Sequence, residues 1–300
     1  MNDHIVSRGW QWNIAEGHEL TVLDARTGLI VDTARPIKSN FAELDYMTYT
    51  DASGNPVRDV DIAFTKIERR VLNKIREIRV NNCRDEHRDA VADLFGIHLV
   101  RSKAMRASKL RLIAQHGPDL AYELSQRPEV QAKFLRVLGR LPYPGEIEQL
   151  TRDFTARQVE TNEYFVENLP RLQRQIRDMM SKYYLQVVES TGNLPGFIIG
   201  DVPVVHAHLA TQRFGFKDQL ALGDSDYLAG PISRRVAVLF TATRLPHKVV
   251  QTKKMISKLN VMAVFAADRE VACHPDDAMA VKRLLHDRER FRSFEALSGR

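Results

Sequence analysis

The pattern of hydrophobic and polar residues divides the 300-residue chain into three parts. In residues 1–58, the segments HELTVLD and LIVDT alternate or cluster apolar residues on either side of the turn-forming sequence ARTG. This pattern predicts a β-hairpin that is closed at Gly28. The loop sequence SGNP, at residues 53–56, then separates the hairpin region from the segment that follows.

In residues 59–190 the apolar positions repeat with the period of a helix. Ile67 and Val71 begin a run at helical spacing, and Thr65, three residues before Glu68, resembles a capping box. This part of the chain is therefore predicted to form a central helical bundle.

The limits of the later helices follow from glycine and proline. A second helix is predicted from about Asp85, and a helical run is expected to end at Gly117-Pro118. Residues 146–189 again have helical spacing, and Pro170 either divides this stretch or kinks it.

Residues 191–300 return to strand patterns. The segments GFIIGDVPVVHAH, QLALGD and RRVAVLFTAT predict strands, and MISKLNVMAVFAADREVA predicts a helix that leads into another strand. A last helix is expected from Asp276 or Asp277. The expected class is α+β, with an N-terminal β-hairpin region (1–58), a central helical bundle (59–190) and a C-terminal small β-sheet with helices (191–300) that packs with the hairpin.

The amino-acid composition bears on the cellular compartment and on the partners of the protein. The two cysteines, Cys83 and Cys273, lack CxxC spacing, which indicates a reducing compartment and no thiolate zinc site. The first residues lack an export signal, and no apolar run is long enough to cross a membrane, so we expect a cytoplasmic protein without a membrane partner. A net charge of +6 favours encounters with nucleic acid or another polyanion, although solvated arginine-rich helices explain it equally well.

Several landmarks occur in a fixed order along the chain: a His-x-Val-type segment at His4, then LTVLDARTGLI, AFTKIERRV, LFGIHLVRS, GFIIGDVPVV, PISRRVAVLF and SKLNVMAVFAADREV. Together they resemble the bacterial domain-of-unknown-function family 4238. Two positions depart from the family pattern, because Ser7 replaces a proline and Gly200-Asp201-Val202-Pro203 replaces a Ser-Asp-Asn-Pro signature.

The resemblance directs attention to three residues as catalytic candidates. His4 titrates near neutrality and suits acid, base or ligand roles, and Arg101 follows an apolar run from which its guanidinium could hold a carboxylate or phosphate. Asp201 lies where a strand ends, as a base or cation ligand, or in an Asx-turn that only ends the strand. An ordinary chain terminus and a surface ion pair are the structural alternatives for His4 and Arg101.

The densest basic run is the candidate nucleic-acid-binding surface, formed by Lys103, Arg106, Lys109 and Arg111. At 100° per residue these side chains spread around a helix, so a solvated helix is an equal alternative. Arg111 and His116 also match the spacing of helical HEPN-type ribonucleases, a weak signal in a chain with 10 histidines.

Metal and cofactor motifs are sparse. His206 and His208 share a strand face but lack a third ligand, which favours ordinary exposed strand positions. The sequence contains no HExxH, GxSxG, GxGxxG or P-loop motif, so no metal site is assigned and a divalent metal ion stays open as a cofactor.

These observations lead to two hypotheses. The first is a phosphate- or nucleic-acid-directed bacterial enzyme, a nuclease-like effector or other hydrolase, in which His4, Arg101 and Asp201 meet between the helical and β parts. The second is a non-enzymatic module that binds protein or nucleic acid through its helical middle. Neither the substrate nor the oligomeric state follows from the sequence.

Overall fold

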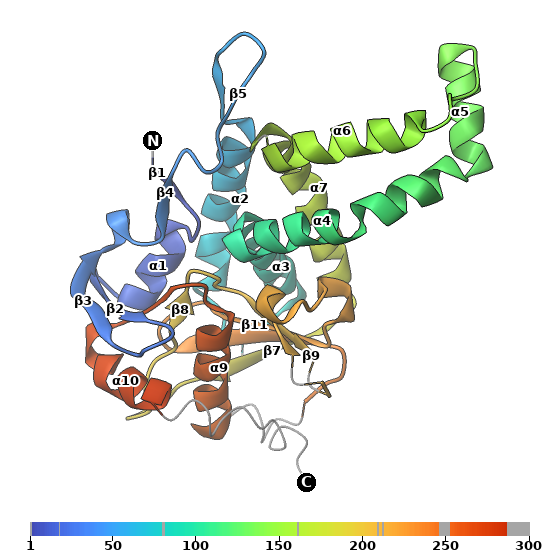
Figure 1. The fold of residues 1–300 in the computed structure, drawn as a ribbon. Helices are drawn as coiled ribbons and strands as arrows, with labels where there is room; N and C mark the ends of the chain where they lie inside the picture. Colours follow the sequence, from blue (N-terminus) through green and yellow to red (C-terminus); the bar gives the residue numbers. More distant parts are fainter. Residues whose placement is uncertain are drawn as a thin grey trace.

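One of the two larger β-sheets of the computed structural model, the four-stranded sheet, contains strands from both ends of the chain (Figure 1). The four-stranded antiparallel sheet has the order β3-β2-β13-β8, and Ala272 of β13 pairs with Val22 of β2. The last strand of the described residues therefore lies beside the N-terminal hairpin. The structure describes residues 2–17, 19–79, 82–160, 162–208, 210–211, 213–245 and 253–286.

The hairpin of this sheet forms as its sequence predicts. Asp24 accepts a hydrogen bond from the amide of Gly28, whose positive φ of 70° a glycine adopts without strain. The strands are β2 (Glu19–Asp24), β3 (Ile30–Pro36), β8 (Ile199–Gly200) and β13 (Glu270–Cys273).

The five-stranded antiparallel sheet is buried on both faces. Every residue of β11 and β12 is buried, since the helix α9 packs on this sheet and Phe95 of α3 contacts Phe240 and Gly230 from the other side. The sheet order is β10 (Arg213–Phe214), β9 (Val205–His208), β11 (Tyr227–Pro231), β12 (Val236–Thr241) and β7 (Tyr184–Glu189), and α9 spans Lys253–Ala266.

Two element predictions in this region were wrong. Residues 184–189 were expected to be helical but form β7, because their backbone pairs with β12 along its whole length. The segment QLALGD was expected to be a strand, yet it contains a short 3-10 helix, η3 (Leu222–Asp224). Tertiary pairing decides between helix and strand in such short apolar segments.

The helices α2 (Asp59–Ile75), α3 (Asp85–Arg101) and α7 (Asn162–Met180) pack side by side over the sheets. The central helix α3 is buried from Ala90 to Arg101 without interruption. The predicted capping box at Thr65 was wrong, because α2 begins six residues earlier and Glu68 faces the protein interior. Pro170 lies inside α7 and does not divide the helix.

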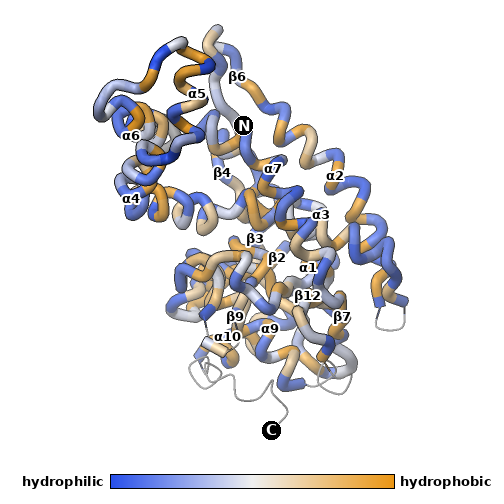
Figure 2. Tube along the Cα trace, turned by 90° about the vertical axis from the view of Figure 1, so that its right-hand side faces the viewer, coloured by the Kyte–Doolittle hydropathy of each residue, from blue (hydrophilic) through white to orange (hydrophobic). Residues whose placement is uncertain are grey.

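A helical arm projects from this body (Figure 1 and Figure 2). It consists of α4 (Lys103–Ser125), α5 (Pro128–Leu138) and α6 (Glu146–Glu160), and α4 continues through Pro118, beyond the predicted stop. Ten of the 17 exposed large apolar side chains in the described residues belong to the arm, so its surface is unusually apolar: Leu112, Leu120, Tyr122, Leu135, Val137, Leu138, Leu141, Tyr143, Leu150 and Phe154.

Shorter elements complete the fold and support the N-terminal segment. The two-stranded ribbon of β1 and β4 holds the first residues of the chain against the body. No helix in the described ranges is long and apolar enough to cross a membrane. The remaining elements are β1 (Asn2–His4), α1 (Arg8–Ala15), η1 (Ile37–Ser39), β4 (Ala42–Leu44), β5 (Tyr49–Thr50), β6 (Pro56–Val57), η2 (Phe216–Asp218), η4 (Pro275–Asp277) and α10 (Ala278–His286).

Candidate functional site

A cleft of about 350 Å³ lies where β1, α1, α2 and the end of α3 meet. Two of the three predicted catalytic residues, His4 and Arg101, line this cleft, together with Glu68, Arg8 and Arg69. The ribbon and three helices thus bring the N-terminal histidine to residues about 100 positions away in the sequence.

The floor of the cleft is a buried ion pair between neighbouring helices. Nη1 of Arg101 lies 2.7 Å from Oε1 of Glu68, and Nη2 of Arg101 lies 3.3 Å from Oδ1 of Asp61. The guanidinium also covers the ring of Phe64 at 5.3 Å. Burial raises the pKa of Glu68, but the charges of Arg101 and His98 outweigh it and hold that pKa below the ordinary value.

This geometry changes the role expected for Arg101. The sequence suggested that its guanidinium emerges from the helix to hold an anion, but the residue is only 2% exposed and its terminal nitrogens donate to Glu68 and Asp61. Arg101 therefore holds two carboxylates beneath the cleft, and both of its terminal nitrogens are engaged in these bonds.

His98 connects the ion pair to the N-terminal segment. Its Nδ1 lies 3.0 Å from the carbonyl oxygen of Ile5, and because a carbonyl only accepts, this nitrogen carries the proton. Its Nε2 lies 3.3 Å from Oε1 of Glu68, without hydrogen-bond alignment, and the ring stacks edge-on against Trp10. This contact fixes the chain directly after His4.

A second ion pair holds the chain directly before His4. Oδ1 of the buried Asp3 lies 2.6 Å from Nη2 of Arg58, and its Oδ2 accepts a hydrogen bond from the amide of Met47. Arg58 also reaches Asp61, which joins this pair to Arg101. His4 is thus held on both sides, in contrast to the mobile terminus that was the structural alternative.

The hydrogen bond of His4 determines which nitrogen is available for chemistry. Its Nε2 lies 3.2 Å from the carbonyl oxygen of Lys38, so Nε2 carries the proton and Nδ1 of the neutral ring keeps its lone pair. Burial and then the charge of Arg8 lower the pKa of His4 below its ordinary value. The imidazole is therefore neutral at pH 7 and able to accept a proton.

Arg8 and Arg69 supply the uncompensated positive charge of the cleft. Both side chains are exposed, and neither makes an ion pair with an acidic residue in the described part of the chain. The other two arginines of the lining, Arg58 and Arg101, are paired with carboxylates. An anion that enters the cleft would meet these two guanidinium groups beside the imidazole of His4.

Asp201 does not join this cleft. It lines a separate pocket of about 240 Å³, where its carboxylate accepts hydrogen bonds from the amides of Asp268, Arg269 and Glu270 at 2.6, 2.8 and 3.4 Å. Burial raises its pKa, while these three bonds lower it. Asp201 therefore ties the end of β8 to the turn before β13. It does not line the cleft of His4 and Arg101, contrary to the expectation from the sequence.

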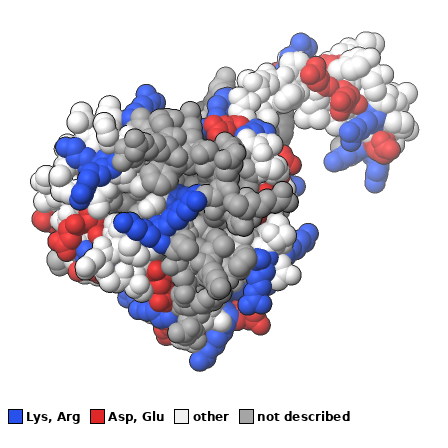
Figure 3. Space-filling model, turned by 90° about the horizontal axis from the view of Figure 1, so that it is seen from below, with Lys and Arg blue, Asp and Glu red and all other residues white. Residues whose placement is uncertain are grey.

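The basic side chains at the start of α4 contact different parts of the protein. Lys103 pairs with Glu43, Arg106 donates to Asn162, and Arg111 donates to the carbonyl of Phe216. Lys109 lies over the ring of Tyr164, and burial lowers its pKa. The four cations therefore do not form one stripe, and the face seen in Figure 3 likewise mixes basic and acidic side chains.

The two histidines of β9 make hydrogen bonds within the protein. His206 is fully buried, its Nε2 contacts the carbonyl of Leu220, and burial lowers its pKa to about 4, so its expected exposure was wrong. His208 contacts the hydroxyl of Thr211. Within the described ranges, no group of three or more histidine, cysteine, aspartate or glutamate side chains is arranged to hold a metal ion.

Two acidic site residues that sequence reasoning missed, Asp61 and Glu68, lie in one stripe of α2. Asp61, Phe64, Glu68, Val71 and Ile75 follow each other at intervals of three and four, which places them on one helix face. Two acidic residues in an otherwise apolar stripe indicate a buried charge that needs a partner. That signal was present in the sequence and was interpreted as a helix cap.

The fold and the cleft define an α+β protein in which a buried network of charges fixes an N-terminal histidine beside two arginines. The chain belongs to the family described as "Protein of unknown function (DUF4238)", whose model matches residues 8–277. Comparisons with curated proteins and with solved structures gave no match. The family and the α+β class expected from the sequence are thus confirmed.

Proposed function

We propose that this protein is a phosphate-directed enzyme, a nuclease-like hydrolase of bacterial origin that acts on the phosphodiester bonds of nucleic acid in the His4 cleft. The observation that supports the proposal is the neutral imidazole of His4, whose Nδ1 keeps a lone pair, next to the unpaired guanidinium groups of Arg8 and Arg69. Phosphodiester cleavage is accelerated by a positioned base and by cations that stabilise the charge of the transition state.

Each residue has a defined role in the proposed reaction. Nδ1 of His4 accepts the proton of the attacking hydroxyl, from water or from a ribose, as the new P–O bond forms. Arg8 and Arg69 bind the non-bridging oxygens of the phosphate. The P–O bond to the leaving oxygen breaks, and this oxygen takes its proton from water. Arg101 and Glu68 are positioning residues that keep α2, α3 and the N-terminal ribbon in place.

The test is a cleavage assay with single-stranded RNA, single-stranded DNA and duplex DNA, in EDTA and in Mg²⁺ or Mn²⁺. His4→Gln is expected to lower the cleavage rate by about 10²- to 10⁴-fold, the range for loss of a general base. Arg8→Gln is expected to weaken substrate binding. Arg171→Gln, which removes an exposed charge from α7, is the matched control. Absence of cleavage in every condition would refute the enzyme proposal.

The projecting arm favours a second candidate function, a protein-interaction module. We infer that its partner is a second copy of the chain, because α4 is divided in charge. Lys109 and Arg111 lie near its start, and Asp119 and Glu123 lie near its end. Two antiparallel arms would pair these ends and cover their apolar side chains in a four-helix arrangement.

Sedimentation velocity over a range of protein concentrations tests this alternative. The wild type is expected to form dimers, and Leu120→Glu and Leu150→Glu are expected to shift the population to monomers. Met279→Glu changes an equally exposed apolar residue on α10 and is expected to have no effect. A wild-type protein that is monomeric at all concentrations would contradict this function without affecting the cleavage proposal.

A further inference from the structure

A cavity of about 530 Å³ lies at the opposite end of α1 and α2 from the His4 cleft. Its walls come from the end of α1, the end of α2, the residues after β7 and the turn between β11 and β12. This volume is within the range of pockets that bind small molecules, roughly 300–1,000 Å³.

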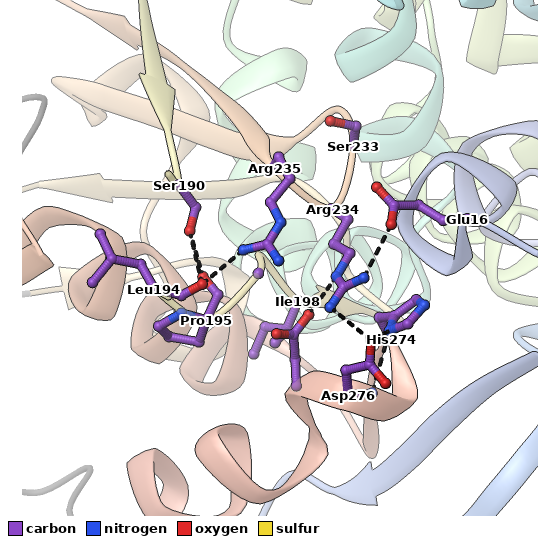
Figure 4. A network of polar contacts seen from close by, with 12 residues as sticks. Glu16, Ser190, Leu194, Pro195, Ile198, Ser233, Arg234, Arg235, His274 and Asp276 are labelled. Atoms are coloured by element: carbon purple, nitrogen blue, oxygen red, sulfur yellow. Dashed lines mark hydrogen bonds and ion pairs between the residues drawn. The ribbon is translucent and has the colours of Figure 1, made fainter. Parts of the chain in front are cut away.

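The pocket contains three arginines, Arg76, Arg79 and Arg235, and none of them makes an ion pair with an acidic residue that the structure describes. Two acidic residues also line the pocket. Glu16 pairs with Arg234, as Figure 4 shows, but Arg234 also pairs with Asp276 and Asp277, so Glu16 and Glu189 both count against the three arginines. The three arginines and two glutamates of the lining therefore give an excess of one positive charge.

The arginines also keep most of their hydrogen-bond donors for a ligand. Each guanidinium has about five N–H groups. Arg76 uses Nε to donate to Asn13, and Arg235 uses Nη1 to donate to the carbonyl of Leu194 at 2.7 Å. Figure 4 shows Arg235 extending toward Ser190 and Leu194, whereas Arg234 turns toward Glu16.

Uncharged side chains add further hydrogen-bond donors to those of the arginines in this pocket. Nδ2 of Asn13 is buried and has no acceptor among the described residues. The hydroxyl oxygen of Ser233 accepts a hydrogen bond from the amide of Val236, which leaves its proton to donate. Trp12, which is 42% exposed, supplies an aromatic wall to the same pocket.

We propose that this pocket binds the phosphate group of a small phosphomonoester. A phosphomonoester has about 1.5 to 2 negative charges at pH 7 and three acceptor oxygens. Its three terminal oxygens match the donor set better than the two oxygens of a carboxylate or the two non-bridging oxygens of a phosphodiester. The organic part of the ligand lies against Trp12. This site uses residues other than those of the His4 cleft and is independent of the proposed cleavage activity.

Isothermal titration calorimetry tests the site with two matched pairs of probes, ribose 5-phosphate against ribose and AMP against adenosine. The phosphorylated member of each pair is expected to bind, and the unphosphorylated member is not. Stronger binding of AMP than of ribose 5-phosphate would add a nucleobase to the ligand class. Absence of binding by both phosphates, or equal binding within each pair, would overturn the proposal.

Variants then locate the binding. Arg235→Gln and Arg76→Gln are each expected to weaken phosphate binding by about tenfold or more, as loss of a charged hydrogen bond predicts. Arg76→Lys keeps the charge and is expected to recover part of the affinity. Arg171→Gln has the same change in net charge and should bind as the wild type, and circular dichroism verifies that each variant is folded. Binding that is unchanged in both Arg→Gln variants would place the phosphate elsewhere and refute the site.

The intrinsic fluorescence of the protein gives an independent measurement. Trp10 is fully buried, so a fluorescence change on ligand binding is expected to come from Trp12 and to disappear in Trp12→Phe. The Arg8→Gln variant is expected to bind phosphomonoesters normally and to lose only nucleic-acid binding in the His4 cleft. The phosphomonoester proposal and the cleavage proposal can therefore be refuted independently of each other.

Discussion

Arg101 and Glu68 form an ion pair 2.7 Å long between α3 and α2, and both side chains are almost completely buried. The pair lies beneath His4, and each partner has a second contact, Arg101 with Asp61 and Glu68 with His98. Because a buried charge is costly without its partner, these residues act as a unit that fixes the walls of the cleft.

Breaking this pair on one side is expected to destabilise the protein strongly. Arg101→Met leaves the Glu68 carboxylate buried and should lower the free energy of unfolding by about 3–5 kcal/mol, as for other buried pairs. The double variant Arg101→Met/Glu68→Met should be less destabilised than the sum of the single variants. Urea denaturation of all four proteins measures this coupling, and additive effects would show that the pair does not act as a unit.

The same pair predicts a loss of stability in acid. The pKa of Glu68 is held below its ordinary value of 4.5, so the unfolded chain takes up this proton at a higher pH than the folded protein. The contribution of Glu68 is therefore fully present above pH 4.5 and decreases as the pH falls toward the folded pKa. Thermal unfolding between pH 3 and 7 should show a shallower acid slope for Glu68→Gln than for the wild type.

His4 provides a test of the electrostatics at the mouth of the cleft. Its pKa lies below 6.5, and the charge of Arg8 is one of the causes. Arg8→Gln should therefore raise the NMR titration midpoint of His4, and Arg171→Gln should leave it unchanged. If cleavage depends on neutral His4, the wild-type rate falls at low pH as His4 becomes protonated. This fall should be absent from the pH profile of His4→Gln. A His4 midpoint at or above 6.5 in the wild type would show that burial and Arg8 do not lower its pKa.

Asp201 is expected to affect stability and not chemistry. In Asp201→Asn, the new amide group would face backbone N–H groups that now donate to the carboxylate, which costs about 1–3 kcal/mol for unpaired buried donors. Asp268→Asn removes a charge from the same turn without removing these bonds and is the control. If Asp201→Asn abolished nucleic-acid cleavage while stability stayed unchanged, Asp201 would belong to the active site after all.

The sequence predicted those elements whose local pattern agrees with the final packing. The Gly28 hairpin was found from its turn sequence, and the helix before β13 from its long apolar run, which is buried almost continuously in the structure. The strand at residues 184–189 was missed because a short apolar run fits either period, and its pairing with β12 involves residues about 50 positions away. Pro118 was interpreted as a stop, yet α4 continues through it on the exposed arm.

The candidate site was predicted only in part, for a similar reason. His4 and Arg101 were found and line one cleft, but the sequence did not show that Glu68 holds Arg101 inside the protein. Whether a charged side chain is buried or exposed depends on which helix packs against it, and the sequence around that residue does not show this. Arg8 and Arg69 had no distinguishing pattern, since they differ from other surface arginines only by what surrounds them.

The network around Arg234 leads to a last prediction, on stability. Arg234 joins the end of α1 to η4, with Nη1 at 3.0 Å from Glu16 and Nε at 2.8 Å from Asp277 (Figure 4). Gly196 packs against this network, and a Cβ atom at that position would lie 2.4 Å from Oδ2 of Asp277 and 3.0 Å from the carbonyl oxygen of Arg234. The backbone neighbour cannot rotate away, so Gly196→Ala must displace the Arg234–Asp277 pair.

We expect Gly196→Ala to lower the free energy of unfolding by about 1–3 kcal/mol, the usual cost of an inserted methyl group in a tightly packed interior. Gly223→Ala is the matched control, because a Cβ atom there has no described neighbour within 4 Å. Chemical denaturation of the two variants makes the comparison. Since Arg234 is adjacent to Arg235, the Gly196→Ala variant should also bind phosphomonoesters more weakly, and equal stability of the two variants would show that the network tolerates the added methyl group.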